Sequence, residues 1–271
     1  MREAQFAGIF YPENRDVLEK QVRSFISAEE KKNIKAGISP HAGYEYSGKI
    51  AGMVYSLLPE KKNFVILGVN HSGIGNKISF SLDDWKTPLG VLKVNKAFAE
   101  TIMQKLRKEG LEAGVSEIAH KEEHSIEVQL PFLQVSQNRF EIIPILLHNL
   151  SYDECRKTAE ILAGLIKDNE ILIASSDFTH YGKNYRFMPF PDAKDIYKLD
   201  NEIIFQVLKN NSKSFYTIAG KSTVCGVLGV AVLTEIARIK NWKAKLLKYT
   251  TSGDITQNWK SVVGYAGIVF E

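Results

Sequence analysis

The sequence predicts an α/β protein, a layered sandwich formed by a single domain over residues 1–271, and three observations support this. Short runs rich in Ile, Val and Leu alternate along the chain with segments of helical periodicity. The runs are almost continuously apolar, as in strands that are covered on both faces. No internal repeat and no Gly/Ser-rich or Pro-rich linker interrupts the alternation. We therefore expect a mainly parallel or mixed sheet with helices on both of its faces.

The composition excludes several classes of protein. With 271 residues, 44% of them hydrophobic and 24% charged, the chain is neither disordered nor collagen-like nor a coiled rod. The net charge is only +4 and the lysines are spread, so no nucleic-acid partner is expected. The longest uncharged stretches fall short of the roughly 18 apolar residues that a membrane span needs. Since no secretory signal is visible either, we expect a cytoplasmic protein without a membrane partner.

Six apolar runs predict the strands. They are residues 34–39, 64–69, 141–147, 171–175, 246–250 and 262–270. A short excursion in extended chain is expected over 78–80 and 91–94.

Apolar stripes and capping signals predict the helices. Stripes at helical spacing cover residues 17–26 and 50–58, the second ending at Pro59. A third helix is bracketed by an N-cap at Asn95 and a glycine at Gly110. Ser151 and Glu154 have the spacing of a capping box at the head of a fourth. Two more helices are expected at about 192–209 and 226–240.

Histidines follow the ends of four predicted strands. Ligands bind beyond the carboxyl ends of strands in open α/β sheets, because the strand-to-helix loops and helix N-termini converge there. Any single loop histidine is equally well explained as a polar cap at the rim of the sheet. Four of the six histidines in the chain at the same edge, however, favour a functional site: His41, His71, His148 and His180.

The two cysteines have different settings. Cys225 precedes an apolar helix, so the partial positive charge of the helix N-terminus is expected to lower its thiol pKa and favour a reactive or metal-ligating thiolate. A small buried hydrophobe is an equally weighted alternative. Cys155 is in step with Ala159 and Leu162 on a helix face and is predicted to lie in the core. Two cysteines exclude a disulfide scaffold and zinc sites built on a CxxC pair.

Residues 120–124 match the H-x-x-E-H spacing of inverted zincin proteases, in which His120 and His124 would bind zinc and Glu123 would act as base. Pro131 would close such a helix early, and Ser125 is typical of a helix start. A solvated charge run, or a supporting role for His124, is favoured over the protease hypothesis.

Several motifs, in order along the chain, resemble the MEMO family, named after the mediator of ErbB2-driven cell motility. The match runs nearly end to end. It is carried by AGIFYP at 7–12, PHAGY at 40–44, LG with NH at 67–71, EHSIEVQLP at 123–131, SSDFTHYG at 175–182, VCG at 224–226 and SVVGYA at 261–266.

The resemblance implies a fold similar to the class III extradiol (LigB-type) non-haem iron dioxygenases. It also implies a metal bound by His41, His71 and Cys225, with Asp177, His180 and His124 in the surrounding cleft. Ser72 replaces a histidine that is common in the family, so any role of that side chain is lost. Ile9 and Phe10 stand where many members have Ser-Trp, a difference that concerns packing.

A cysteine ligand in place of a carboxylate suits copper, zinc or tightly held iron, so ring cleavage does not follow from the fold. The leading hypothesis is therefore a mononuclear iron or copper protein, and more specifically a dioxygenase-like oxidoreductase. Zinc is a further candidate metal. His180 would give or take a proton and Asp177 would orient it. The competing hypothesis is a non-catalytic module that binds a peptide or small molecule in the same cleft. Animal members of the family are associated with phosphotyrosine-peptide binding.

Overall fold

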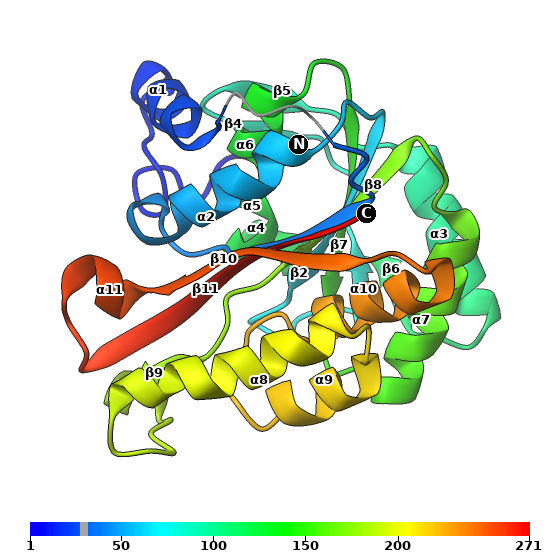
Figure 1. The fold of residues 1–271 in the computed structure, drawn as a ribbon. Helices are drawn as coiled ribbons and strands as arrows, with labels where there is room; N and C mark the ends of the chain where they lie inside the picture. The colour runs from blue at the N-terminus through cyan, green and yellow to red at the C-terminus, as the bar shows by residue number, and fades with distance from the viewer. Residues whose placement is uncertain (28–31) are drawn as a thin grey trace.

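A computed structural model describes residues 1–27 and 32–271. Over these residues the chain forms a mixed sheet of nine strands in the order β10-β11-β1-β8-β2-β7-β3-β6, with β9 paired to β11 (Figure 1). The strands of this sheet are β1 (Ala36–Ser39), β2 (Asn63–Val69), β3 (Ile78–Phe80), β6 (Ala113–Val115), β7 (Glu141–Leu147), β8 (Glu170–Ser175), β9 (His180–Gly182), β10 (Ala244–Thr251) and β11 (Ser261–Phe270). A separate hairpin joins β4 (Trp85–Thr87) to β5 (Gly90–Leu92).

The four central strands of the sheet are parallel, and the strand next to them on each side runs antiparallel. β1, β8, β2 and β7 pair in parallel, whereas β11 runs antiparallel to β1 and β3 antiparallel to β7. The four central strands therefore end at one edge, with their last residues at Ser39, Ser175, Val69 and Leu147. The predicted mixed sheet is confirmed, and this edge is where the predicted site residues follow.

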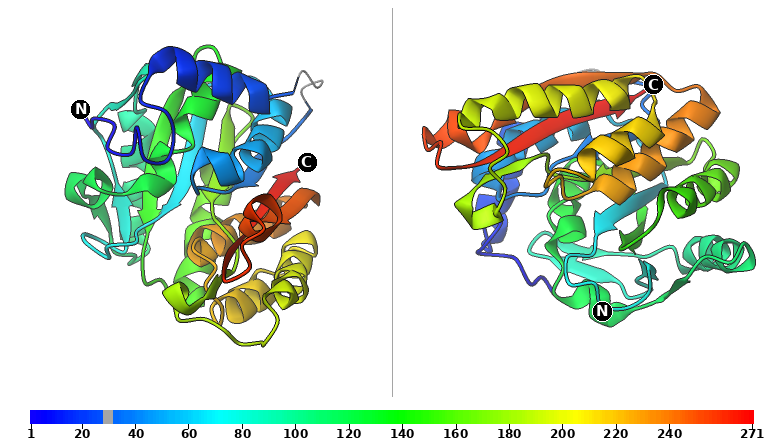
Figure 2. Two further views of the ribbon diagram at one scale, coloured as in Figure 1. Left: turned by 90° about the vertical axis from the view of Figure 1, so that its left-hand side faces the viewer. Right: turned by 90° about the horizontal axis from the view of Figure 1, so that it is seen from below.

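Helices cover both faces of the sheet (Figures 1 and 2). One face carries α1 (Arg15–Phe25), α2 (Tyr44–Leu57) and α6 (Leu130–Ser136), and the other carries α3 (Lys96–Lys108), α7 (Tyr152–Leu165), α8 (Ile196–Leu208), α9 (Ser212–Ala219) and α10 (Val227–Lys240). Short helices α4 (Glu117–Lys121), α5 (His124–Glu127) and α11 (Ser252–Thr256) complete the set. The layered sandwich is thus confirmed. Within the described ranges, no helix combines the length and apolarity that crossing a membrane requires.

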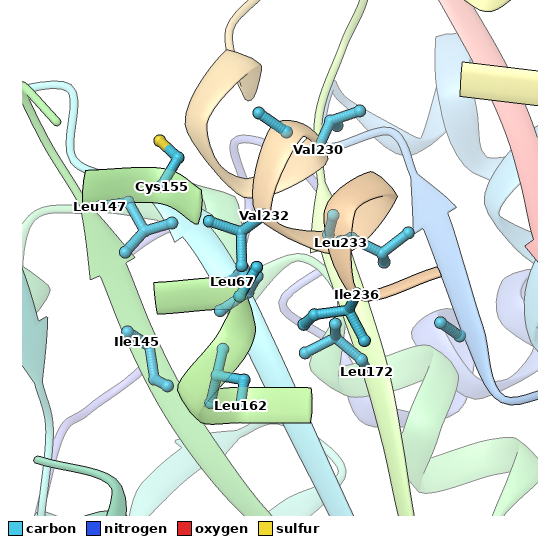
Figure 3. Packing of buried hydrophobic residues seen from close by; sticks show 14 of the residues in the cluster. Leu67, Ile145, Leu147, Cys155, Leu162, Leu172, Val230, Val232, Leu233 and Ile236 are labelled. Carbon is cyan, nitrogen blue, oxygen red and sulfur yellow. The ribbon is translucent and has the colours of Figure 1, made fainter. Parts of the chain in front are cut away.

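The central strands supply both halves of the hydrophobic core. In β8, Ile171 and Ile173 pack under α1, α2 and α6, whereas Leu172 and Ala174 face the opposite layer of helices. Because successive side chains of a strand point to opposite faces, a continuous apolar run fits a strand buried on both sides. Figure 3 shows the second layer, where Cys155 lies with other apolar side chains of the cluster. The prediction that Cys155 is a core residue is confirmed.

Most of the predicted element ends agree with the structure. Asn95 caps α3 by accepting a hydrogen bond from the backbone N of Phe98, and Ser151 and Glu154 form the predicted capping box of α7. The first strand begins at Ala36 rather than at residue 34, and α8 begins at Ile196 after a single 3₁₀ turn, Ala193–Asp195. Helix α9 was not predicted from the sequence.

One close approach depends on a missing side chain. A Cβ atom at Gly68, near the end of β2, would lie 2.5 Å from Cγ1 of Ile126 and 2.9 Å from Oγ of Ser125 in α5. A glycine at this position therefore lets α5 rest directly on the strand end.

Gly68→Ala is expected to destabilise the protein by about 1–3 kcal/mol, the usual cost of overpacking. Gly164→Ala is the matched control, because Gly164 lies in α7 and no atom of the described residues lies within 4 Å of its Cβ position. That variant should be more stable by about 0.5–1 kcal/mol, since alanine favours a helix interior. Urea unfolding of the three proteins measures both effects, and equal stability of the Gly68→Ala variant and the wild type would contradict the packing argument.

Candidate metal centre

Three of the predicted site residues meet at the carboxyl edge of the sheet. His41 follows β1, His71 follows β2 and Cys225 immediately precedes α10 and its N-cap Gly226. One potential ligand atom from each lies within 4.8 Å of the other two. His41 is buried, Cys225 is half-buried and His71 is exposed, so the group opens to solvent on the side of His71.

Hydrogen bonds around Ser175 fix the tautomer of His41. The Ser175 hydroxyl donates to the carbonyl of Ser125 at 2.6 Å and accepts from Nε2 of Gln129 at 2.8 Å. Its only proton is thus committed, so it accepts from Nδ1–H of His41, 3.0 Å away. The lone pair of His41 is therefore on Nε2, which is buried and has no hydrogen-bond partner within residues 1–27 and 32–271. Burial and the neighbouring His71 lower the pKa of His41 to about 3, so the ring is neutral.

A carboxylate fixes the tautomer of His71. Both oxygens of Glu123 lie 3.0 Å from Nδ1 of His71, and Oε2 also accepts from its backbone N at 2.8 Å. Burial alone would raise the pKa of Glu123, but these bonds and one from the backbone N of Ser125 lower it to about 2. A histidine that donates Nδ1–H to a carboxylate presents Nε2 to a metal, an arrangement typical of metal sites. The rings of His41 and His71 are perpendicular at 89°, so their planes intersect.

The thiol of Cys225 differs from the sequence prediction in its acidity. Burial raises the pKa of Cys225, and the nearby carboxylates of Asp177 and Glu123 raise it further. The prediction that the helix N-terminus would lower this pKa is therefore wrong for the protein without a cation. The helix dipole is outweighed because two carboxylates and a buried setting both favour the neutral thiol. A bound metal ion would supply positive charge there, and a coordinating thiol is deprotonated outright.

His180 is oriented by carbonyl groups rather than by Asp177. Its Nδ1 lies 3.0 Å from the carbonyl oxygens of both Phe178 and Thr223, so Nδ1 carries the proton. Its Nε2 then has the lone pair and lies 3.8 Å from Sγ of Cys225. Asp177 instead accepts a hydrogen bond from the backbone N of His41 at 2.8 Å. The predicted orienting hydrogen bond is wrong: this carboxylate anchors the backbone of a candidate ligand.

His124 belongs to the wall of the site. Its ring stacks between Phe10, at a centroid distance of 4.5 Å, and His71, at 4.9 Å. His71, Glu123 and His124 also bring potential ligand atoms within 4.8 Å of one another. The two imidazole planes are only 11° from parallel, however, and lone pairs in stacked parallel planes do not converge on one ion. We therefore assign His124 to packing against His71 and Phe10.

The structure separates the two histidines of the zincin-like motif. Helix α4 ends at Lys121 and α5 begins at His124, so no single helix places His120 and His124 on one face. Nε2 of His120 donates instead to the carbonyl of Ser79 at 3.0 Å. His120 and Glu123 are buried, so a solvated charge run is wrong for both, although Lys121 and Glu122 are exposed.

His148 lies beside the candidate ligands but not among them. It is half-buried and, with Cys225, helps to line a small cavity of about 150 Å³. The candidate ligand groups found in residues 1–27 and 32–271 do not include it.

The fold and the site define an α/β protein with a candidate metal centre of two histidines and a cysteine. The family described as Memo-like protein matches residues 2–269 of the chain. A MEMO1 family protein of Archaeoglobus fulgidus is 38% identical over 275 residues, covering 100% of this chain and 99% of that protein. Those of Methanosarcina barkeri and Aquifex aeolicus are 38% and 35% identical, again over 100% of this chain and 100% and 99% of their own lengths. The chain belongs to the Memo family.

The buried His120 makes stability depend on pH. Its pKa is lowered by burial from 6.5 to about 3, so unfolding takes up a proton between these values and stability falls as the pH falls through them. His120→Gln, which keeps a donor for Ser79, should reduce the slope of unfolding free energy against pH by up to about 1.4 kcal/mol per pH unit there. Urea unfolding from pH 8 to pH 4 measures this. Above pH 7 the two slopes should coincide, and coincidence at pH 5 as well would refute the assignment.

Proposed function

We propose that this Memo-family protein binds one iron or copper ion, or in their place zinc, through Nε2 of His41, Nε2 of His71 and Sγ of Cys225. We further propose that it works as a dioxygenase-like oxidoreductase. The observation that carries the proposal is the buried Nε2 of His41, which has a lone pair and no partner in the described part of the chain. Buried polar atoms without a partner are rare because they cost free energy, and a metal–ligand bond would satisfy this one.

The donor set suits the proposed metals. Imidazole nitrogens bind iron, copper and zinc, and a thiolate favours softer ions over magnesium or calcium. Both histidines are already fixed with Nδ1 protonated, so neither ring needs to change tautomer to become a ligand. A bound iron or copper ion would supply one-electron and oxygen chemistry that no protein side chain provides.

The surrounding residues support proton transfer next to the proposed metal. His180 holds its Nδ1 proton between two carbonyl oxygens, which leaves Nε2 to accept or return a proton on the side of Cys225. Asp177 keeps the backbone of His41 in place. Phe10 stacks on His124, which in turn stacks on His71.

We propose the cytoplasm as the compartment of this protein. The two cysteines are both free, and thiols are kept reduced in the cytosol. A free thiol at the site is what the proposed metal ligation requires.

The proposed thiolate ligand can be tested with Cys225→Ser, for which Cys155→Ala is the control. Wild-type protein loaded with copper or iron should hold one ion per chain and show a thiolate-to-metal absorption band, which Cys225→Ser should abolish. Cys155→Ala should keep both, because Cys155 lies in the core on α7. Metal analysis and absorption spectra measure the result. A band that persists in Cys225→Ser, or a wild-type chain that retains no ion after anaerobic reconstitution, would refute the proposed ligands.

Oxygen uptake on catechols tests the oxidoreductase part of the proposal. We expect the iron-loaded wild type to consume oxygen in the presence of a catechol. The rate of oxygen uptake should be at least about tenfold lower in His180→Gln, in line with the usual contribution of a general acid or base. If no metal binds and His41→Ala leaves peptide affinity unchanged, the cleft is a binding module instead.

A further inference from the structure

The N-terminal arm, residues 2–11, lies against residues 120–127, which include Glu123, the hydrogen-bond partner of His71. Arg2 has only 7% of its surface exposed and forms an isolated bridge with Trp85. Its hydrogen-bond acceptors at residues 120, 123 and 127 are more than a hundred residues away in sequence. The guanidinium lies over the indole ring of Trp85, 4.1 Å from its centroid.

Each nitrogen of the Arg2 guanidinium has a separate partner. Nη1 donates to Oε2 of Glu127 at 2.5 Å, Nε donates to the carbonyl of His120 at 2.6 Å, and Nη2 donates to the carbonyl of Glu123 at 2.9 Å. These three acceptors span α4, α5 and the turn between them. One planar side chain therefore binds two backbone carbonyls and one carboxylate of this segment.

The carboxylate of Glu127 connects the rest of the arm to the same turn. It accepts hydrogen bonds from the backbone N of Gln5 at 3.1 Å, the backbone N of Phe6 at 2.8 Å and the hydroxyl of Tyr11 at 2.5 Å. The arm is thereby held so that the rings of Phe6 and Phe10 both contact His124.

We propose that Arg2 is a positioning residue for the metal centre. Arg2 fixes the backbone of Glu123, whose carboxylate in turn fixes both the ring and the backbone N of His71. Through Glu127 it also fixes the arm that packs on His124, which stacks on His71. The inference rests on the proposed function, because His71 is taken to be a ligand.

The geometry requires arginine rather than any cation. Lysine at this position could still neutralise Glu127, but one ammonium group cannot reproduce the planar fork that serves three acceptors in different directions. Arg2→Lys therefore removes the positioning contacts while keeping the buried charge paired. Arg23→Lys is the matched control, because Arg23 pairs with Glu19 on the exposed surface of α1.

Cobalt(II) titration of the full chain tests the proposal. Arg2→Lys should bind cobalt about 10–100-fold more weakly than wild type, as expected when a residue supporting a ligand is lost, and should shift the thiolate-to-cobalt band. Arg23→Lys should bind with wild-type affinity and an unchanged spectrum. A folded Arg2→Lys protein with wild-type affinity and an unchanged band would overturn the proposal, whatever its thermal stability.

Hydrogen exchange in the wild type provides a second test that does not depend on a variant folding. Coupling between two sites is reciprocal, so cobalt binding at the centre must slow exchange of the backbone amides of Gln5 and Phe6, which bond to Glu127. The amides of Asp16 and Val17, bonded to Asn14 at the head of α1, should be unaffected. Unchanged exchange at Gln5 and Phe6 with cobalt bound would overturn the inference. A wild type that binds no cobalt would instead overturn the proposed function.

Discussion

The structure of the site depends on one buried polar turn, residues 123–127. Glu123 holds His71, and the hydroxyl of Ser125 lies 3.0 Å from both the backbone N and the carbonyl of Val69 at the end of β2. The carbonyl of Ser125 accepts from Ser175 at the end of β8, and Glu127 holds the N-terminal arm. Such a network is costly to bury unless every member has a partner, so it is either complete or strongly destabilising. Because it is complete, the turn holds the ends of β2 and β8 and the N-terminal arm in fixed positions relative to one another.

Three histidines at this edge of the sheet are held in the same tautomer. Each of His41, His71 and His180 has its Nδ1 beside an oxygen acceptor, so each presents Nε2. The acceptors differ: a serine hydroxyl, a carboxylate and two backbone carbonyls. All three arrangements leave the lone pair on Nε2. Nε2 is therefore the atom with which each ring can bind a metal or accept a proton at this edge of the sheet. The proposed ligand atoms are already arranged in the protein without an ion, which would limit the reorganisation that binding requires.

The sequence predicted what depends on local pattern and missed what depends on tertiary contact. The apolar runs placed the strand ends, and with them His41, His71 and His180, because strands buried on both faces read directly as such. Glu123 was missed as the partner of His71, because its neighbours Lys121 and Glu122 are exposed and make the segment resemble a solvated run. Asp177 was assigned to the wrong histidine, since an adjacent position in sequence does not reveal which N–H its carboxylate accepts. The short α9 carries too few turns for its periodicity to be read.

Neighbouring charges help to account for the protonation state of the Cys225 thiol. The thiol lies near Asp177 and Glu123, and both carboxylates raise its pKa. Ionising it without a cation would gather three negative groups in a half-buried place, which the low local dielectric strongly opposes. The proposed divalent ion would reverse the balance, because its two positive charges would offset the thiolate and the carboxylate of Glu123 together. Its binding would release the thiol proton, so the affinity for the ion should increase with pH. The two carboxylates that keep the thiol neutral in the free protein are, by the same charges, what favours a cation there.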